Sequence, residues 1–111
     1  MRKIKVSINH EKLQTSSEIL RALAHPLRMM ILEFIDTNKS VHVNEIYNTL
    51  KLEQSITSQH LRVLRAAGVV VTKREGKYIH YAIDYSKVSN ATSAVGQFLE
   101  RNEVILEDED Y

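Results

Sequence analysis

Hydrophobic residues recur at helical spacing along most of the chain, and this pattern predicts five helices. Pro26 suits the first turn of the second helix, because a residue there needs no partner for its backbone N–H. Gly68 is expected to end the fourth helix, since glycine adopts the left-handed conformation that closes a helix. The predicted helices cover residues 10–24, 26–35, 43–50, 54–67 and 86–105.

The stretch between the last two helices is rich in β-branched and aromatic residues instead. Residues 69–72 and 78–83 are predicted to form strands joined by the basic segment 73–77. An alternation of apolar and polar residues over 4–8 suggests a short extended segment near the start. We therefore predict a mainly α fold with a small β-hairpin.

The third and fourth helices are separated only by residues 51–53, which predicts a helix-turn-helix over residues 43–67. The hairpin, residues 69–84, follows directly and has a basic tip, as a wing does. Because 111 residues allow one domain with one modest core, residues 1–111 are interpreted as a single winged-helix domain. It would have about five helices, a two-stranded wing and an acidic tail over residues 107–111.

The fourth helix has a polar face suited to reading DNA. On a helical wheel, Ser55, Ser58, Gln59 and Arg62 lie on one face, opposite a face that includes Leu61. Serine, glutamine and arginine can hydrogen-bond to base edges in the major groove. We expect Gln59 to contact an adenine edge, and Arg62 a guanine or a phosphate.

The start and the inward flank of this helix have other expected roles. Gln54 and Ser55 open it, where free backbone N–H groups favour a phosphate. The wheel places His60 on the inward-leaning flank, which favours a partly buried structural histidine over a DNA contact.

Charge is unevenly distributed, although the formal net charge is only +1. Five basic residues lie within 54–80 against Glu75 alone, whereas residues 100–111 hold six acidic residues against one arginine. The basic region therefore coincides with the proposed DNA reader. The predicted wing contacts, to phosphates or the minor groove, are Lys73, Arg74, Lys77 and Tyr78.

Composition excludes several other functions. The chain has no cysteine, so it forms no disulfide, thiolate metal site or thiol redox switch. Only three glycines are present and no glycine-rich phosphate loop. There is also no cysteine nucleophile and no pair of carboxylates beside a histidine in a periodic context, which argues against an enzyme. No apolar run approaches the roughly 20 residues that span a bilayer, and no signal-peptide core follows the basic start. These features favour the cytoplasm.

Three separated motifs resemble the ArsR/SmtB family of bacterial winged-helix repressors, over about residues 15–100. They are Leu23-Ala24-His25-Pro26-Leu27-Arg28, the helix Gln54-Ser55 to Ser58-Gln59-His60-Leu61 with Leu64 and Gly68, and Arg74-Glu75-Gly76-Lys77 with Tyr81. The resemblance implies a homodimer in which the first and last helices pack together. It also implies binding to an inverted repeat at a promoter, and a signal that lowers DNA affinity.

The last helix carries a wide apolar stripe. Such a stripe, at the end of so short a chain, favours contact with a second copy. The residues expected at a dimer interface on the first and last helices are Leu13, Leu20, Val88, Val95, Phe98 and Leu99.

Metal sensing is not expected. Sensors of the family carry cysteines in the third helix, or aspartate and histidine motifs in the last helix. Here His42 and Asn44 occupy the cysteine positions, and no histidine follows His80. His10 and His42, with Glu11 or Glu45, are the only conceivable ligands, and lone histidines are usually ordinary surface or capping residues. We predict no cofactor; the signal is a small organic ligand, a partner protein or protein concentration alone.

The sequence thus predicts a sequence-specific DNA-binding regulator, a repressor that acts as a homodimer. One alternative is a winged-helix interaction module without DNA binding. Acidic or apolar residues would then be expected on the face of Ser55, Gln59 and Arg62, which is polar and basic instead. The other alternative is a histidine-based metal-sensing repressor.

Overall fold

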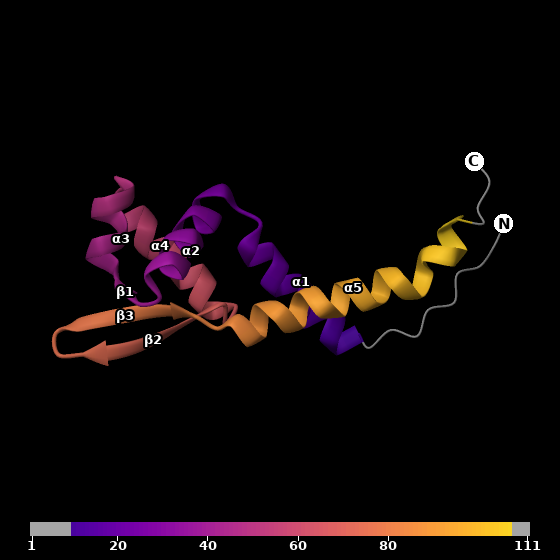
Figure 1. The fold of residues 1–111 in the computed structure, drawn as a ribbon. Coiled ribbons are helices and arrows are strands. Elements are labelled where there is room, and N and C mark those ends of the chain that lie inside the picture. Colours follow the sequence, from indigo (N-terminus) through magenta and orange to yellow (C-terminus); the bar gives the residue numbers. More distant parts are fainter. Residues whose placement is uncertain (1–9, 108–111) are drawn as a thin grey trace.

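The computed structural model describes the backbone of residues 10–107 and the side-chain environments of residues 11–97 (Figure 1). The extended segment expected over residues 4–8 lies outside the described residues, as do residues 108–111 of the acidic tail. The elements are α1 His10–Leu23, α2 Pro26–Asn38, β1 Val41–His42, α3 Val43–Leu50, α4 Gln54–Ala66, β2 Val70–Glu75, β3 Tyr78–Ile83 and α5 Tyr85–Glu107. Over the described residues, this is the predicted winged helix-turn-helix with five helices.

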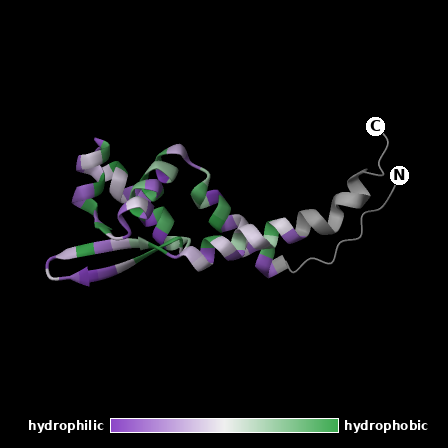
Figure 2. Ribbon diagram, in the orientation of Figure 1, coloured by the Kyte–Doolittle hydropathy of each residue, from purple (hydrophilic) through white to green (hydrophobic). Residues whose placement is uncertain are grey.

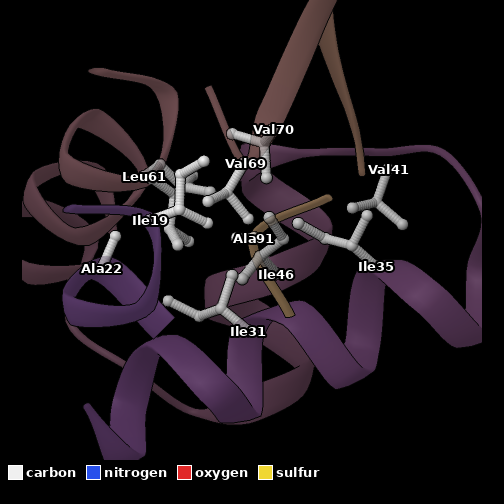
Figure 3. Packing of buried hydrophobic residues seen from close by; sticks show 11 residues of the cluster. Ile19, Ala22, Ile31, Ile35, Val41, Ile46, Leu61, Val69, Val70 and Ala91 are labelled. Atoms are coloured by element: carbon white, nitrogen blue, oxygen red, sulfur yellow. The ribbon is translucent and has the colours of Figure 1, made fainter. Parts of the chain in front are cut away.

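The core lies where α2, α3, α4 and the first residues of the wing meet, with further buried side chains from α1, β1 and α5. Most apolar positions expected from the helical periodicity enter it, although Met30 of the α2 stripe is exposed, and Figure 3 shows the buried side chains gathered in one cluster. Burying one such isoleucine or leucine stabilises the fold by about 1.5–3 kcal/mol. The largest buried side chains are Ile31, Ile35, Ile46, Leu61, Leu64, Val41, Val69 and Val70.

The sheet has three strands rather than the predicted two. Its order is β1-β3-β2, and both pairings are antiparallel. Strand β1 pairs Val41 with Tyr81 and His42 with His80. Two residues are too few to show an alternating pattern, so this strand could not be recognised from the sequence. It ties the start of α3 to the wing.

The wing strands are also longer than predicted. Lys73, Arg74 and Glu75 were expected in the connection, but all three pair with β3, and Glu75 lies opposite Tyr78. Only Gly76 and Lys77 remain in the turn, where Gly76 has a φ of 62°. A two-residue turn with a positive φ matches the twist of a hairpin.

Helix α2 continues past its predicted end at residue 35. The Oγ1 atom of Thr37 donates to the carbonyl of Glu33 at 2.9 Å, and Nδ2 of Asn38 donates to the carbonyl of Phe34 at 2.8 Å. These polar side chains suggested a loop. Because they hydrogen-bond to carbonyls of the preceding turn, the helix extends over them instead.

Helices α1 and α5 lie side by side and extend away from the body that carries the wing (Figure 1). The molecule is accordingly elongated, at 59 × 25 × 21 Å. Figure 2 shows hydrophilic residues along much of β2 toward the wing tip, and hydrophobic residues interspersed with hydrophilic ones along the helices of the body. Among the described helices, none is long and apolar enough to cross a membrane.

Candidate nucleic-acid interface

The turn between α3 and α4 sets the direction of the predicted reading helix. Lys51 adopts the left-handed conformation, with a φ of 57°, and closes α3 by donating its N–H to the carbonyl of Tyr47. Glu53 then precedes α4, and its carbonyl accepts from both the N–H and Oγ1 of Thr57, at 3.0 and 2.9 Å. These bonds satisfy the polar atoms of a fully buried threonine.

The two faces of α4 match the helical wheel at most positions. Thr57, Leu61 and Leu64 are buried. Gln54, Ser55, Gln59 and Arg62 are exposed. Ser58 is half-buried, because it lies at the flank beside Thr57 and not at the centre of the outward face. The exposed polar face is thus confirmed, and its contacts to DNA stay a prediction.

An acidic residue, Glu53, immediately precedes α4 as its N-cap. Oγ of Ser55 donates to Oε1 of Glu53 at 3.0 Å. The carboxylate therefore lies beside the free N–H groups that were expected to attract a phosphate, and it opposes that attraction. Glu53 was interpreted only as a turn residue, although its position before the helix was visible in the sequence.

The DNA contacts predicted from the sequence also leave out two exposed apolar side chains on α4. Ile56 is 40% exposed and Val63 is 39% exposed, and a spacing of seven residues places them near one another in angle on the helix. An exposed branched side chain on a reading helix can contact the methyl group of thymine.

His60 is half-buried, as predicted for a structural histidine. Its ring centroid lies 4.6 Å from that of His25, and its Nδ1 lies 3.4 Å from Nη1 of Arg28. Burial, followed by the proximity of His25 and Arg28, lowers the pKa of His60 from its usual value of 6.5. The side chain thus serves the packing of α4 on the α1–α2 junction.

Arg28 links three elements at this junction. Its Nε donates to the carbonyl of Ala22 at 2.6 Å and its Nη2 to the carbonyl of Arg21 at 3.3 Å, both at the end of α1. Its third contact is with His60 on α4. Nearby, Nδ1 of His25 accepts from the N–H of Leu27 and caps the start of α2.

The wing exposes its basic side chains. Lys73 is held only loosely, with Nζ 3.8 Å from Oε1 of Glu75, and Nε of Arg74 donates to the carbonyl of Gly76 at 3.3 Å. Nζ of Lys77 lies 5.4 Å from the ring centroid of Tyr78. Exposed pairs of this kind are weak, so these cations can exchange their partners for phosphates.

Tyr78 is packed against a histidine. Its ring stacks on His42, with centroids 4.6 Å apart and an interplanar angle of 18°. His42 precedes α3, where its N–H donates to Oε1 of Glu45 and its Nε2 lies 3.2 Å from the same oxygen. His80 meets the His42 ring edge-on at 5.7 Å. His42 therefore caps α3 and supports the wing.

The residues considered as metal ligands do not form a site in the part of the chain that the structure describes. Within that part, no three histidine, cysteine or acidic side chains are placed to hold a metal ion. Glu45 is engaged with His42, and Glu11 is exposed on α1. The side chain of His10 lies outside the described set.

The residues expected at a dimer interface lie on the adjacent helices α1 and α5. Leu13, Leu20, Val88 and Val95 are half-buried in the single chain. Val88 packs against the core of its own chain, so part of the α5 stripe has an intramolecular role. The side chains of Phe98 and Leu99 lie outside the described set.

Comparison with known proteins identifies the family. The model described as "Bacterial regulatory protein, arsR family" matches residues 25–72. The transcriptional repressor PagR of Bacillus anthracis is 37% identical over 81 residues, which are 73% of this chain and 81% of PagR. The crystal structure of PagR has a TM-score of 0.68 at 33% identity and covers 78% of this chain and 99% of its own. NolR from Sinorhizobium fredii has a TM-score of 0.65 at 30% identity, over 87% of this chain and 95% of its own. The chain therefore belongs to the ArsR family of DNA-binding transcriptional regulators, which are not enzymes.

Proposed function

We propose that this regulator binds an inverted repeat at a promoter as a homodimer and represses transcription in the cytoplasm. The observation that carries the proposal is the uncovered polar face of α4, where Gln59 and Arg62 are exposed while Leu61 anchors the opposite face in the core. A helix held in this way by a helix-turn-helix can enter the major groove with its outward side chains toward the bases.

The side chains at the centre of the polar face of α4 read the DNA sequence directly. Gln59 hydrogen-bonds to an adenine edge, and Arg62 bonds to a guanine or a phosphate. Ile56 and Val63 add apolar contact with thymine methyl groups. Ser58, being half-buried, has less reach than these four side chains.

Phosphate contacts fix the position of the protein on DNA. At the start of α4, Gln54 and Ser55 contact the backbone, with Glu53 limiting the attraction there. In the wing, Lys73, Arg74 and Lys77 supply positive charge without sequence preference. Tyr78 supports this region through its stacking on His42 and can offer its hydroxyl to the backbone.

Dimerisation follows from the geometry of DNA. One reading helix covers few base pairs, whereas a two-fold dimer places two helices about 34 Å apart, on half-sites one helical turn apart. The paired helices α1 and α5 project from the body and carry Leu13, Leu20 and Val95, which are only half-buried. A second copy covers these side chains, and an effector that alters the pairing lowers DNA affinity.

The test is the electrophoretic mobility of DNA fragments from the region upstream of the gene, incubated with the purified full chain. We expect a saturable shift for one fragment, and weaker binding by an Arg62→Ala variant. The matched control is Arg21→Ala, which removes an exposed arginine from α1. If no fragment shifts at moderate salt, the chain is an interaction module and the proposal is wrong. If both variants bind like the wild type, the assignment of α4 is wrong.

A further inference from the structure

A cavity of about 680 Å³ lies between α2, the start of α5 and the base of the wing. Its volume is in the range of roughly 300–1,000 Å³ that is typical of small-molecule sites. None of the residues assigned to DNA contacts lines it, and only Val88 belongs to the expected dimer interface.

The walls of the cavity are apolar and adaptable. Val69 and Ile83 line it from the wing, and Met29 and Met30 line it from α2. Both methionines are exposed, at 59% and 43%. Flexible, polarisable thioethers adjust to ligands of different shape and make favourable contacts with aromatic rings. The walls therefore suit an apolar ligand with aromatic groups.

The charged groups in the lining are all acidic. Glu33 and Asp36 lie one turn apart on α2, and Oδ1 of Asp36 accepts from the hydroxyl of Tyr85 at 2.5 Å. A cation already approaches this corner from outside the lining, because Nζ of Lys39 lies 3.7 Å from Asp36 and 5.8 Å from the Tyr85 ring centroid. Lys39 therefore partly neutralises the charge of Asp36, and Glu33 provides the remaining negative charge of the lining.

From the apolar walls and this acidic edge, we propose that the cavity binds an apolar organic cation that bears aromatic groups. The acidic edge complements a positive ligand and repels an anion of the same shape. The cavity contacts Val69 and Ile83 at the base of the wing and Tyr85 at the first position of α5. A bound cation therefore touches both the base of the wing and the helix assigned to dimerisation. The interpretation of this cavity as an effector site rests on the proposed function.

The test uses the full chain without DNA and two probes of equal shape and opposite charge. Isothermal titration is expected to show saturable binding of tetraphenylphosphonium, one per chain, and much weaker binding of tetraphenylborate. Glu33→Gln keeps the shape of an exposed side chain and should weaken binding of the cation about tenfold. Glu18→Gln, which removes an exposed acid from α1 outside the lining, should change nothing. Equal binding of both probes, no binding of either, or no effect of Glu33→Gln overturns the proposal.

A second copy could occupy the cavity instead of a small molecule. Repeating the titration over a range of protein concentrations separates the two occupants, because a covered cavity loses its cation binding as the chain dimerises. If the stoichiometry of cation binding stays the same at high protein concentration, the cavity is a ligand site. If cation binding is lost as the chain dimerises, the proposal is overturned. If the protein shifts DNA but does not bind the cation, the proposed ligand site is wrong and the proposed function is unaffected. If the protein binds the cation but shifts no DNA fragment, the ligand site is supported and the proposed function is wrong.

Discussion

Nη1 of Arg28 lies 3.4 Å from Nδ1 of His60, and this contact joins the start of α2 to the inward flank of the reading helix. Because a guanidinium only donates, Nδ1 of His60 must accept, which requires a neutral imidazole protonated at Nε2. The same guanidinium donates to two carbonyls at the end of α1. A single side chain thus connects the helix assigned to dimerisation with the helix assigned to DNA.

Replacing Arg28 by alanine is expected to destabilise the fold. The substitution leaves the carbonyls of Ala22 and Arg21 without this donor, and an unsatisfied, partly buried group costs about 1–3 kcal/mol. Urea unfolding followed by circular dichroism measures the loss. Arg21→Ala, which removes only an exposed side chain, should lie within about 0.5 kcal/mol of the wild type. Equal stability of both variants would show that the Arg28 contacts contribute nothing.

Stability should fall as the pH drops below the usual pKa of His60. The folded protein lowers that pKa from 6.5, so just below this value the unfolded chain binds more protons than the folded one. The contribution of His60 is therefore fully present above pH 6.5 and is lost as the pH falls from 6.5 toward the folded pKa. His60→Gln, which cannot titrate, should flatten this part of the curve when urea midpoints are compared between about pH 7.5 and pH 5.5. A curve of unchanged slope in the variant would assign the effect to other groups.

Gln59→Ala should relax sequence preference at one base pair of each half-site. Losing a bidentate contact to adenine costs about 1–3 kcal/mol of discrimination, while phosphate contacts remain. Selection of bound sequences from a random pool gives a sequence logo for each variant. The control is Lys77→Ala, which should weaken binding to all sequences and leave the logo intact. An unchanged logo for Gln59→Ala removes this role.

The faces of α4 could be predicted from the sequence because they follow from a local repeat. Thr57, Leu61 and Leu64 return to one side of the helix every three or four residues. The bond between Arg28 and His60 joins residues 32 positions apart, and no local pattern encodes such a pair. The same holds for β1, which exists only because Val41 and His42 meet β3. Helical spacing thus predicted which face of α4 is exposed, whereas tertiary packing determined how the helix is supported.

Lys77→Ala should also reduce the salt dependence of DNA binding. Each phosphate that a cation neutralises releases condensed counterions, so losing one contact lowers the slope of log K against log salt by about one unit. Fluorescence anisotropy on the operator at several salt concentrations gives this slope. Arg21→Ala makes the same change in net charge on α1 and should keep the wild-type slope. If the two variants have equal slopes, Lys77 does not contact phosphate, which counts against the assigned role of the wing.

Val95→Glu is expected to convert dimers into monomers. Val95 is half-buried on α5, so a carboxylate there would be tolerated in a single chain but would lose its water in a dimer interface. Sedimentation velocity separates the two states, and Gln97→Glu adds the same charge at an exposed position two residues further along. The Val95 variant should also lose affinity for the full inverted repeat far more than for a single half-site, because only the full site gains from two linked reading helices. A Val95→Glu protein that still sediments as a dimer would place the interface elsewhere on α1 and α5.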